Sequence, residues 1–247
     1  MKKSGKKVIP VNYFWLSIEG TDAVGKTILL EEIEKFLRNQ KKIRFIVIKE
    51  FSSSSLGNFI KDIINKKKFF SLGDGFHYPF TETLLLCADF FYQFEQVLLK
   101  NTGRKKLFII SDRGLYSFLI YQSLRIKSQY QTSIRVNPKE WIEEIFKPIN
   151  KPHFVILLTS PINQIKQRII ERDGSINEQE LRFIKKAQKE YRKILKGNHQ
   201  PSIILENRNG KFESVKQKAI QKIEEILNVR AKAGFLSPQG HISAFLH

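Results

Sequence analysis

Cysteine is almost missing from this chain of 247 residues, which carries only Cys87. A single thiol cannot form an internal disulfide, so a small disulfide-stapled scaffold is excluded. Long apolar runs are missing too: no stretch of about 18 consecutive apolar residues occurs, and we expect no membrane-spanning helix. These absences favour a domain that folds in a reducing compartment, and we expect a cytoplasmic protein.

Acidic residues are scarce relative to basic ones. The chain has 43 Lys and Arg against 24 Asp and Glu, a formal net charge of +19. A positive surface attracts phosphate-bearing partners, from nucleotides to nucleic acids. The lysines are scattered along predicted helices and form no single block. A solvated surface is therefore favoured, and a nucleic-acid interface is kept as the second interpretation.

The length and composition favour one folded domain with short tails. Hydrophobic residues make up 41% of the chain, which is enough for a substantial core. One α/β domain suits this length better than two small domains. We predict a basic N-terminal tail over residues 1–12 and a domain over 13–228. Hydrophobic periodicity is lost over 229–247, which we expect to be a C-terminal tail.

Strand-like and helix-like segments alternate along the predicted domain. Short apolar runs predict strands over residues 13–19, 44–50, 106–112, 153–159 and 202–206. Helical spacing of apolar residues predicts helices over residues 28–37, 56–64, 81–100, 115–126, 138–146, 161–172, 178–195 and 212–228. Alternation of this kind indicates the α/β class, with a three-layer, doubly wound parallel sheet of about five strands.

A glycine-containing stretch joins the first predicted strand to the first predicted helix. It reads GTDAVGKT and fits the pattern G-x-x-x-x-G-K-[ST] of a P-loop NTPase. Backbone N–H groups of such a loop surround a phosphate, and glycines keep side chains out of the way. The following helix points its positive N-terminus at the same anion. The predicted ATP-binding residues are Gly20, Thr21, Asp22, Ala23, Val24, Gly25, Lys26 and Thr27.

Four polar side chains have predicted roles in phosphate and metal binding. Lys26 reaches the β- and γ-phosphates of ATP, and Thr27 offers its hydroxyl to Mg²⁺. Asp112 and Arg113 close the third predicted strand, at the edge where parallel sheets bind ligands. The planar guanidinium of Arg113 can hold an acceptor monophosphate, and Asp112 can hold Mg²⁺ through water. A structural ion pair is the alternative for Asp112 and Arg113.

The combination of these motifs resembles the thymidylate kinase family. That family has G-x-D-G-x-G-K-[ST], and later D-R-Y followed by a serine and a Tyr-Gln pair; here the stretches are GTDAVGKT and DRGLYSFLIYQ. Residues 81–98 resemble the family's acceptor-site helix, and residues 152–172 resemble its fourth strand and following helix. The resemblance covers residues 13–228. It implies a nucleoside monophosphate kinase that uses ATP and Mg²⁺, favours dTMP as acceptor and forms a homodimer.

The resemblance also assigns roles to single residues. The implied acceptor-binding residues are Glu50, Leu86, Phe90, Arg113, Ser117 and Tyr121. The implied catalytic residues are Asp22, Lys26, Arg113 and Arg172. The P-loop carries no arginine, so a transition-state arginine is expected from a lid near residues 168–182. Arg172 is the first candidate, with Arg168 or Arg182 as alternatives.

Departures from the family pattern concentrate where the base is read. Lys49 replaces the arginine that precedes Glu50, and Phe90 stands in the place of a base-binding arginine. A base site without hydrogen-bond donors loses discrimination, so the accepted base stays open. Phe90, Phe91 and Phe118 either form an apolar wall for the base or belong to the core.

Two further functions stay open at this point. A deoxynucleoside kinase needs a carboxylate after the second strand to take the proton of a sugar hydroxyl, and Glu50 occupies that place. A degenerate family member would bind nucleotide without catalysis, and nucleic acid through its positive surface. The presence of Asp22, Lys26, Thr27 and Arg113 favours a phosphotransferase.

Overall fold

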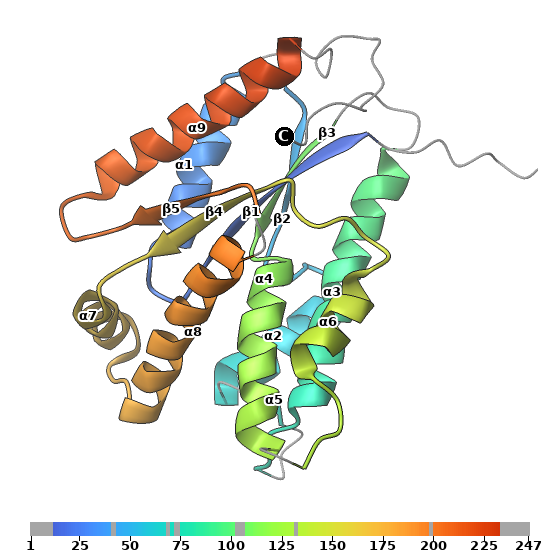
Figure 1. Cartoon of the computed structure of the whole chain (residues 1–247), viewed down its shortest axis with the longest axis vertical. Coiled ribbons are helices and arrows are strands. Elements are labelled where there is room, and N and C mark those ends of the chain that lie inside the picture. Colours follow the sequence, from blue (N-terminus) through green and yellow to red (C-terminus); the bar gives the residue numbers. More distant parts are fainter. Residues whose placement is uncertain are drawn as a thin grey trace, which may run out of the picture.

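A parallel sheet of five strands forms the centre of the computed structural model (Figure 1). The structure describes residues 12–40, 43–67, 70–71, 75–101, 107–130, 133–197 and 200–232. The strands are β1 (Tyr13–Gly20), β2 (Phe45–Ile48), β3 (Leu107–Asp112), β4 (Phe154–Thr159) and β5 (Ser202–Glu206). Their spatial order is β2-β3-β1-β4-β5, and all neighbouring pairs are parallel, which confirms the predicted doubly wound sheet.

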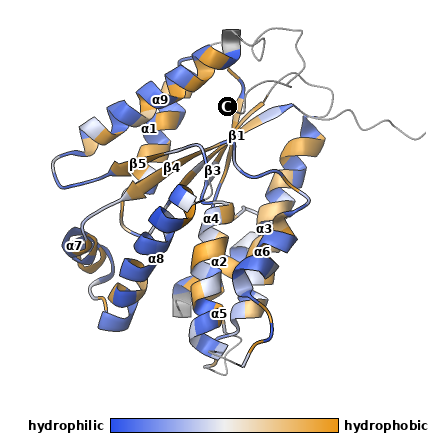
Figure 2. Ribbon diagram, viewed as in Figure 1, coloured by the Kyte–Doolittle hydropathy of each residue, from blue (hydrophilic) through white to orange (hydrophobic). Residues whose placement is uncertain are grey.

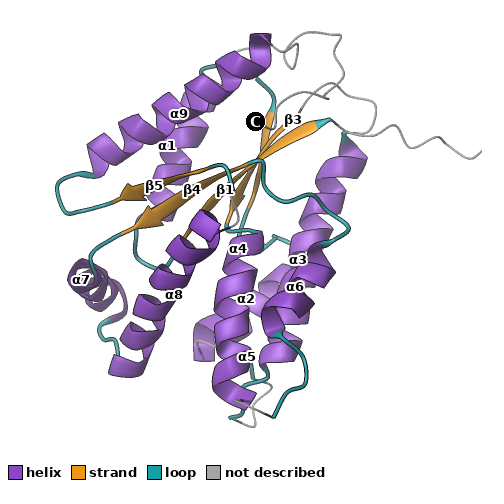
Figure 3. Ribbon diagram, in the orientation of Figure 1, coloured by secondary structure: helices purple, strands orange, loops and turns teal. Residues whose placement is uncertain are grey.

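Helices cover both faces of this sheet (Figure 3). They are α1 (Lys26–Arg38), α2 (Ser55–Lys67), α3 (Pro79–Lys100), α4 (Leu115–Ser117), α5 (Ser123–Tyr130), α6 (Pro138–Phe146), α7 (Ile162–Asp173), α8 (Glu178–Gly197) and α9 (Phe212–Lys232). Helices α1, α7 and α9 share a core cluster with one face of the sheet. A second core cluster lies on the opposite face of the sheet and is formed with α3, α4, α5, α6 and most of α8. Among these described helices, none combines the length and the apolar character that a membrane span requires.

The region after β3 differs from the single helix expected over residues 115–126. There the chain forms α4, then a π-helical turn, η1 (Phe118–Gln122), and then α5. The Ser123 hydroxyl donates to the carbonyl oxygen of Leu119 at 2.5 Å and competes with the backbone ladder. Hydrophobic spacing does not reveal this competition, because it records which residues are apolar and not which group a serine hydroxyl bonds.

The predicted tails fall almost wholly outside the described residues. Residues 1–11 and 233–247 are not described, and Asn12 directly precedes β1. At the other end, α9 continues to Lys232, so residues 229–232 are helical and the tail predicted over 229–247 begins too early.

The side chains of β1 alternate between the two core clusters. Phe14, Leu16 and Ile18 belong to the cluster formed with α1 and α9. Trp15 belongs to the opposite cluster, so the period of a strand places Ser17 and Glu19 on that same face. Both polar side chains are fully buried. The sequence pattern of residues 13–19 indicates an apolar run. The structure shows instead that this central strand buries two polar side chains.

A chain of hydrogen bonds satisfies these buried polar groups. The indole N–H of Trp15 donates to Ser111 Oγ at 2.8 Å, and Ser111 donates to Ser17 Oγ at 3.1 Å. Ser17 in turn donates to Glu19 Oε1 at 2.9 Å, while Ser117 donates to Glu19 Oε2 at 2.5 Å. The strand register places Ser17 directly beside Ser111, which makes the chain possible. Glu19 is thus held rigidly just before the P-loop.

Burial raises the pKa of Glu19 above its ordinary value, although the hydroxyls of Ser117 and Ser17 and the charges of Arg113 and Lys26 act in the opposite direction. A raised native pKa means that the folded protein binds more protons than the unfolded chain between the ordinary value of 4.5 and the native value. The contribution of Glu19 to the free energy of unfolding therefore falls as the pH rises through this window.

We predict that Glu19→Gln removes this loss of stability. The glutamine keeps an acceptor for the serine hydroxyls but carries no charge to desolvate. The free energy of unfolding of the variant, measured by urea denaturation, should rise relative to the wild type from pH 4 to pH 8. A difference between the two proteins that stays constant over this range would show that Glu19 does not titrate as proposed.

Candidate functional site

The two glycines of the P-loop lie where no other residue fits. Gly20 has a φ of 144°, and a Cβ on it would lie 2.3 Å from the carbonyl oxygen of Leu158. Gly25 has a φ of 97°, and its Cβ would lie 2.7 Å from Asn207 Nδ2. Both positions therefore combine a backbone conformation that favours glycine with a close approach of β4 or of the segment after β5.

The carbonyl oxygens of this loop are held by side chains from four different parts of the chain. The pairs are Arg113 NH1 with Gly20 O (2.9 Å), Lys26 Nζ with Thr21 O (2.8 Å), Arg168 NH1 with Ala23 O (3.1 Å) and Asn207 Nδ2 with Val24 O (2.8 Å). In a trans peptide the C=O and the N–H point in opposite directions. Fixing the carbonyls in this way limits the directions that the loop's N–H groups can take, which is what a phosphate cradle requires.

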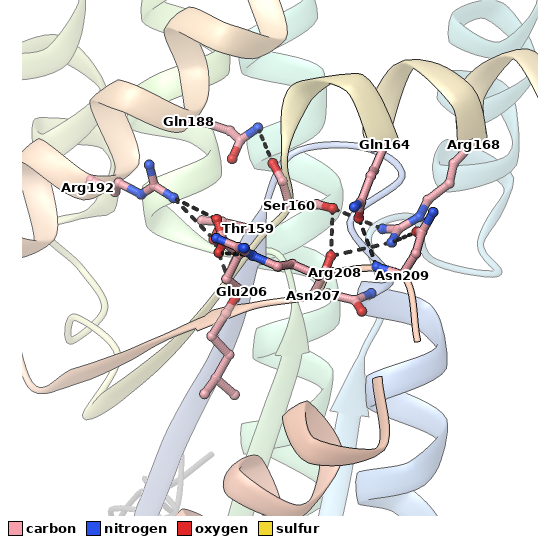
Figure 4. A network of polar contacts seen from close by, with 11 residues as sticks. Thr159, Ser160, Gln164, Arg168, Gln188, Arg192, Glu206, Asn207, Arg208 and Asn209 are labelled. Atoms are coloured by element: carbon pink, nitrogen blue, oxygen red, sulfur yellow. Dashed lines mark hydrogen bonds and ion pairs between the residues drawn. The ribbon is translucent and has the colours of Figure 1, made fainter. Parts of the chain in front are cut away.

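Arg168 belongs to a polar network at the ends of β4 and β5, drawn in Figure 4. Besides its bond to Ala23, its NH1 donates to Ser160 Oγ at 3.2 Å and its NH2 donates to Asn209 Oδ1 at 2.8 Å. Ser160 donates to the carbonyl oxygen of Asn207 at 2.6 Å and so joins the two strand ends. These contacts hold Arg168 against the P-loop in this structure and favour a supporting role over that of a lid arginine.

Arg113 lies at the centre of an ionic cluster beside the loop. Its NH2 donates to a carboxylate oxygen of Asp22, and its Nε lies 2.7 Å from Glu50 Oε1. The guanidinium carbon lies 5.1 Å from the ring centre of Tyr121, within the range of a cation–π contact. Burial acts to lower the pKa of Arg113, but Glu50 and Asp22 outweigh it and hold the pKa well above its usual value.

Asp22 is surrounded by positive charge. Burial acts to raise its pKa, but Arg113, Lys26, Arg172 and Arg125 lower it below the ordinary value. Arg125 was missed by the sequence analysis; it stands on α5 and forms an ion pair with the buried Glu82 of α3. A motif search does not find it, because only the packing of α5 against α3 brings this cation towards the P-loop.

Lys26 begins α1 and is almost completely buried, with 8% of its surface exposed. Burial and the nearby Arg113 lower its pKa, whereas Asp22, Glu50 and Asp112 act to raise it. In this structure its ammonium group bonds the Thr21 carbonyl. An incoming anionic phosphate can compete for that ammonium group, since a charge-assisted bond is stronger than one to a neutral carbonyl.

The residues expected to hold Mg²⁺ have free oxygen atoms. Thr27 is exposed at the start of α1. Asp112 ends β3, and its buried Oδ1 has no hydrogen-bond partner among the described residues. A hard cation prefers such oxygen ligands and usually keeps several waters. This donor set therefore fits magnesium.

The predicted acceptor-binding residues divide into two groups. Glu50, Arg113 and Tyr121 lie together in the ionic cluster. Phe90 is only 6% exposed and packs against core aromatic rings, so it offers little surface to a ligand. Ser117 is also buried, and its hydroxyl is engaged by Glu19 and Tyr191.

The phenylalanines near the acceptor helix pack against one aromatic ring of α6. Phe90, Phe91 and Phe118 all pack against Phe146 of α6, with ring centres 4.9 to 5.6 Å apart. Phe90 belongs to the buried core, whereas Phe91 and Phe118 are half-buried and pack against it. Leu86, one turn earlier on α3, is half-buried.

Helix α3 also fixes the segment that carries Glu50. Gln93 accepts from the backbone N–H of Lys49 at 3.2 Å and donates to its carbonyl oxygen at 3.0 Å. Asp89 accepts from the backbone N–H of Ser52 at 2.8 Å. Asp89 of α3 thus helps to position the loop after β2.

The expected lid corresponds to the end of α7, the loop of residues 174–177 and the start of α8 (Figure 3). Arg172 is largely exposed and forms two hydrogen bonds with Asp173, while its charge still acts on Asp22. Arg182 is 80% exposed and pairs with Glu178. Of the three candidate arginines, Arg172 therefore combines exposure with proximity to the charge of the P-loop.

We predict that Asn207→Ala weakens ATP binding about tenfold or more. The substitution leaves the buried Val24 carbonyl without its donor, a loss of about 1–3 kcal/mol, and releases the loop from its fixed orientation. Binding of ATP can be measured by calorimetry for this variant and for Arg208→Ala, a neighbouring residue that is paired with Glu206. Equal affinities in the two variants would show that the Asn207 contact does not support the cradle.

Comparison with known proteins places the chain in a family. A family model described as thymidylate kinase matches residues 18–219. The probable thymidylate kinase of Sulfurisphaera tokodaii is 24% identical over 209 residues, which is 85% of this chain and 95% of that protein. The thymidylate kinase of Malacoplasma penetrans is 25% identical over 220 residues, or 87% and 92% of the two chains.

Solved structures show the same fold. The thymidylate kinase of Candida albicans aligns with a TM-score of 0.67 at 20% identity, over 88% of this chain and 93% of that one. The thymidylate kinase of Ehrlichia chaffeensis aligns with a TM-score of 0.58 at 15% identity, over 86% and 99%. Because the family model spans most of the sequence, from the end of β1 into α9, the chain belongs to the thymidylate kinase family.

Proposed function

We propose that this protein transfers the γ-phosphoryl group of ATP to dTMP. Membership of the family makes the chain a nucleoside monophosphate kinase; the assignment of dTMP as the acceptor is the proposal. The relatives that the chain matches support dTMP, because they are thymidylate kinases. The contact between Arg113 and the P-loop residue Asp22 supports transfer to an acceptor that carries a phosphate. This contact sets a cation beside the phosphate cradle, where an acceptor phosphate has to be held for in-line transfer.

The residues around Arg113 are suited to positioning and charge neutralisation. A guanidinium has five N–H donors, and Gly20, Asp22 and Glu50 engage one nitrogen each. The remaining N–H donors of Arg113 can bind phosphate oxygens. The ammonium group of Lys26 can stabilise the negative charge on the phosphoryl group during transfer. Magnesium, held through Thr27 and Asp112, would neutralise phosphate charge.

The alternative of a deoxynucleoside kinase requires Glu50 to act as a base towards a sugar hydroxyl. Here Glu50 is engaged by the guanidinium of Arg113. A carboxylate that is already held by a guanidinium is less available to bind a sugar hydroxyl. A monophosphate acceptor needs no such base, so this contact favours the monophosphate. Homodimer formation, which the resemblance implies, stays a prediction.

The proposal predicts a ranking of acceptors. In a coupled assay of ADP release, dTMP should give the highest kcat/KM among the deoxynucleoside monophosphates and thymidine. Lys26→Ala should lower turnover about 100-fold or more, since it removes a cation aimed at the transferred group. Faster turnover of thymidine would establish the nucleoside kinase instead. A wild-type protein that binds ATP but turns over no acceptor would be a degenerate member.

The lid arginine can be tested in the same assay. Arg172→Ala should lower kcat about 100-fold with little change in ATP affinity, because its contact with the transferring group forms only on closure. Arg182→Ala is the matched control on the other side of the loop and should stay near wild type. Arg168→Ala should instead weaken ATP binding, through the Ala23 carbonyl. Normal kcat in Arg172→Ala would exclude it as the transition-state cation.

A further inference from the structure

The solvent side of α8 carries an unbroken row of basic residues. Every exposed position of this helix from residue 182 to residue 196 is Lys or Arg: Arg182, Lys185, Lys186, Lys189, Arg192, Lys193 and Lys196. Their spacing of three or four residues puts them on one face of the helix. Figure 2 shows α8 as a largely hydrophilic helix. These seven residues of one helix thus form a single stripe, which we call the α8 basic face.

Most of this charge is not balanced by nearby acids. Arg182 pairs with Glu178, and Arg192 lies 4.0 Å from Glu206. For the five lysines of the α8 basic face, no carboxylate of the described residues lies within ion-pair distance. Glu190, the acidic residue in the same stretch, is turned to Lys139 at 2.6 Å.

Helix α9, by contrast, carries both signs of charge on its exposed surface. Its exposed charged residues include Glu213, Lys218, Glu224 and Glu225, so both signs are present. Lys216 lies 2.7 Å from Glu213 and 3.6 Å from Glu32. Mixed charges are sufficient for solubility. A single-sign face instead produces a field that attracts a partner of opposite charge.

We propose that the α8 basic face binds the phosphate backbone of nucleic acid without sequence preference. The face runs from Arg182 to Lys196, a length of about 21 Å at a rise of 1.5 Å per residue. One strand of a duplex places roughly six phosphates along that length. A mononucleotide would meet only one or two of the lysines, so the row is too long to serve the substrates alone. This binding does not depend on the proposed function.

Two other polyanions fit the face less well. A helix that binds a membrane surface inserts its apolar side into the lipid. The apolar side of α8 is occupied, because Ile184, Ala187, Tyr191 and Leu195 are buried in the protein. An acidic protein would require carboxylates at a spacing that nothing here specifies, whereas phosphates recur regularly along every strand.

The test compares two triple variants with the same loss of charge. Lys186→Gln, Lys189→Gln and Lys193→Gln together neutralise the centre of the α8 basic face. The control variant removes three positive charges from α9 through Lys216→Gln, Lys218→Gln and Lys222→Gln. Binding of a labelled 30-nucleotide DNA of mixed sequence, single-stranded and duplex, is measured by fluorescence anisotropy from 50 to 200 mM KCl. Turnover of dTMP, or the circular dichroism spectrum, checks that each variant is folded.

We expect the α8 variant to bind about tenfold or more weakly at 50 mM KCl, with a salt slope shallower by about two to three, and the α9 variant to bind nearly as the wild type does. Equal losses in the two variants would attribute binding to the total charge and overturn the proposal. Absence of wild-type binding at 50 mM KCl would also overturn it. So would equal binding to polyglutamate of matched charge or to phosphatidylserine vesicles.

Discussion

The guanidinium of Arg113 joins three segments that are far apart in the sequence. It bonds the Gly20 carbonyl and the Asp22 carboxylate of the P-loop, and it pairs with Glu50 after β2. Arg113 itself follows β3, and its backbone has a φ of 68°, which is uncommon for a residue with a side chain. The neighbouring strands hold it there, because its N–H donates to the carbonyl oxygen of Ile18 in β1 at 3.0 Å. The P-loop and the segments after β2 and β3 are thus joined by one cation.

The rear of the P-loop is supported in a similar way from the opposite side. Arg168 of α7 and Asn207 after β5 hold the carbonyls of Ala23 and Val24. Ala23 has a φ of 57°, so a residue with a Cβ is kept in a conformation that glycine adopts more easily. Backbone strain of this kind persists where surrounding contacts over-determine it. The loop is therefore rigid before any nucleotide arrives, which reduces the ordering required on binding.

Charge in this molecule is organised at two scales. Around Asp22 the cations of four separate elements converge, and they are balanced by Asp22, Glu50 and Glu82. On the surface of α8 the cations are segregated and largely unbalanced. The first arrangement suits the binding of compact phosphate groups in a partly desolvated site, where pairing is needed to offset the cost of burial. The second acts through long-range attraction in water and is screened by salt.

The sequence by itself determined the sheet, the P-loop and the Asp112-Arg113 pair. These features are local: a strand, a turn of two glycines and a helix follow one another within a few residues, and their spacing is set by backbone geometry. The roles of Glu19, Arg168 and Asn207 were decided only by the tertiary structure. Each depends on partners between 98 and 183 residues away. Phe90 and Ser117 show the same limit, because hydrophobic spacing cannot tell whether a side chain near a site faces the ligand or the core.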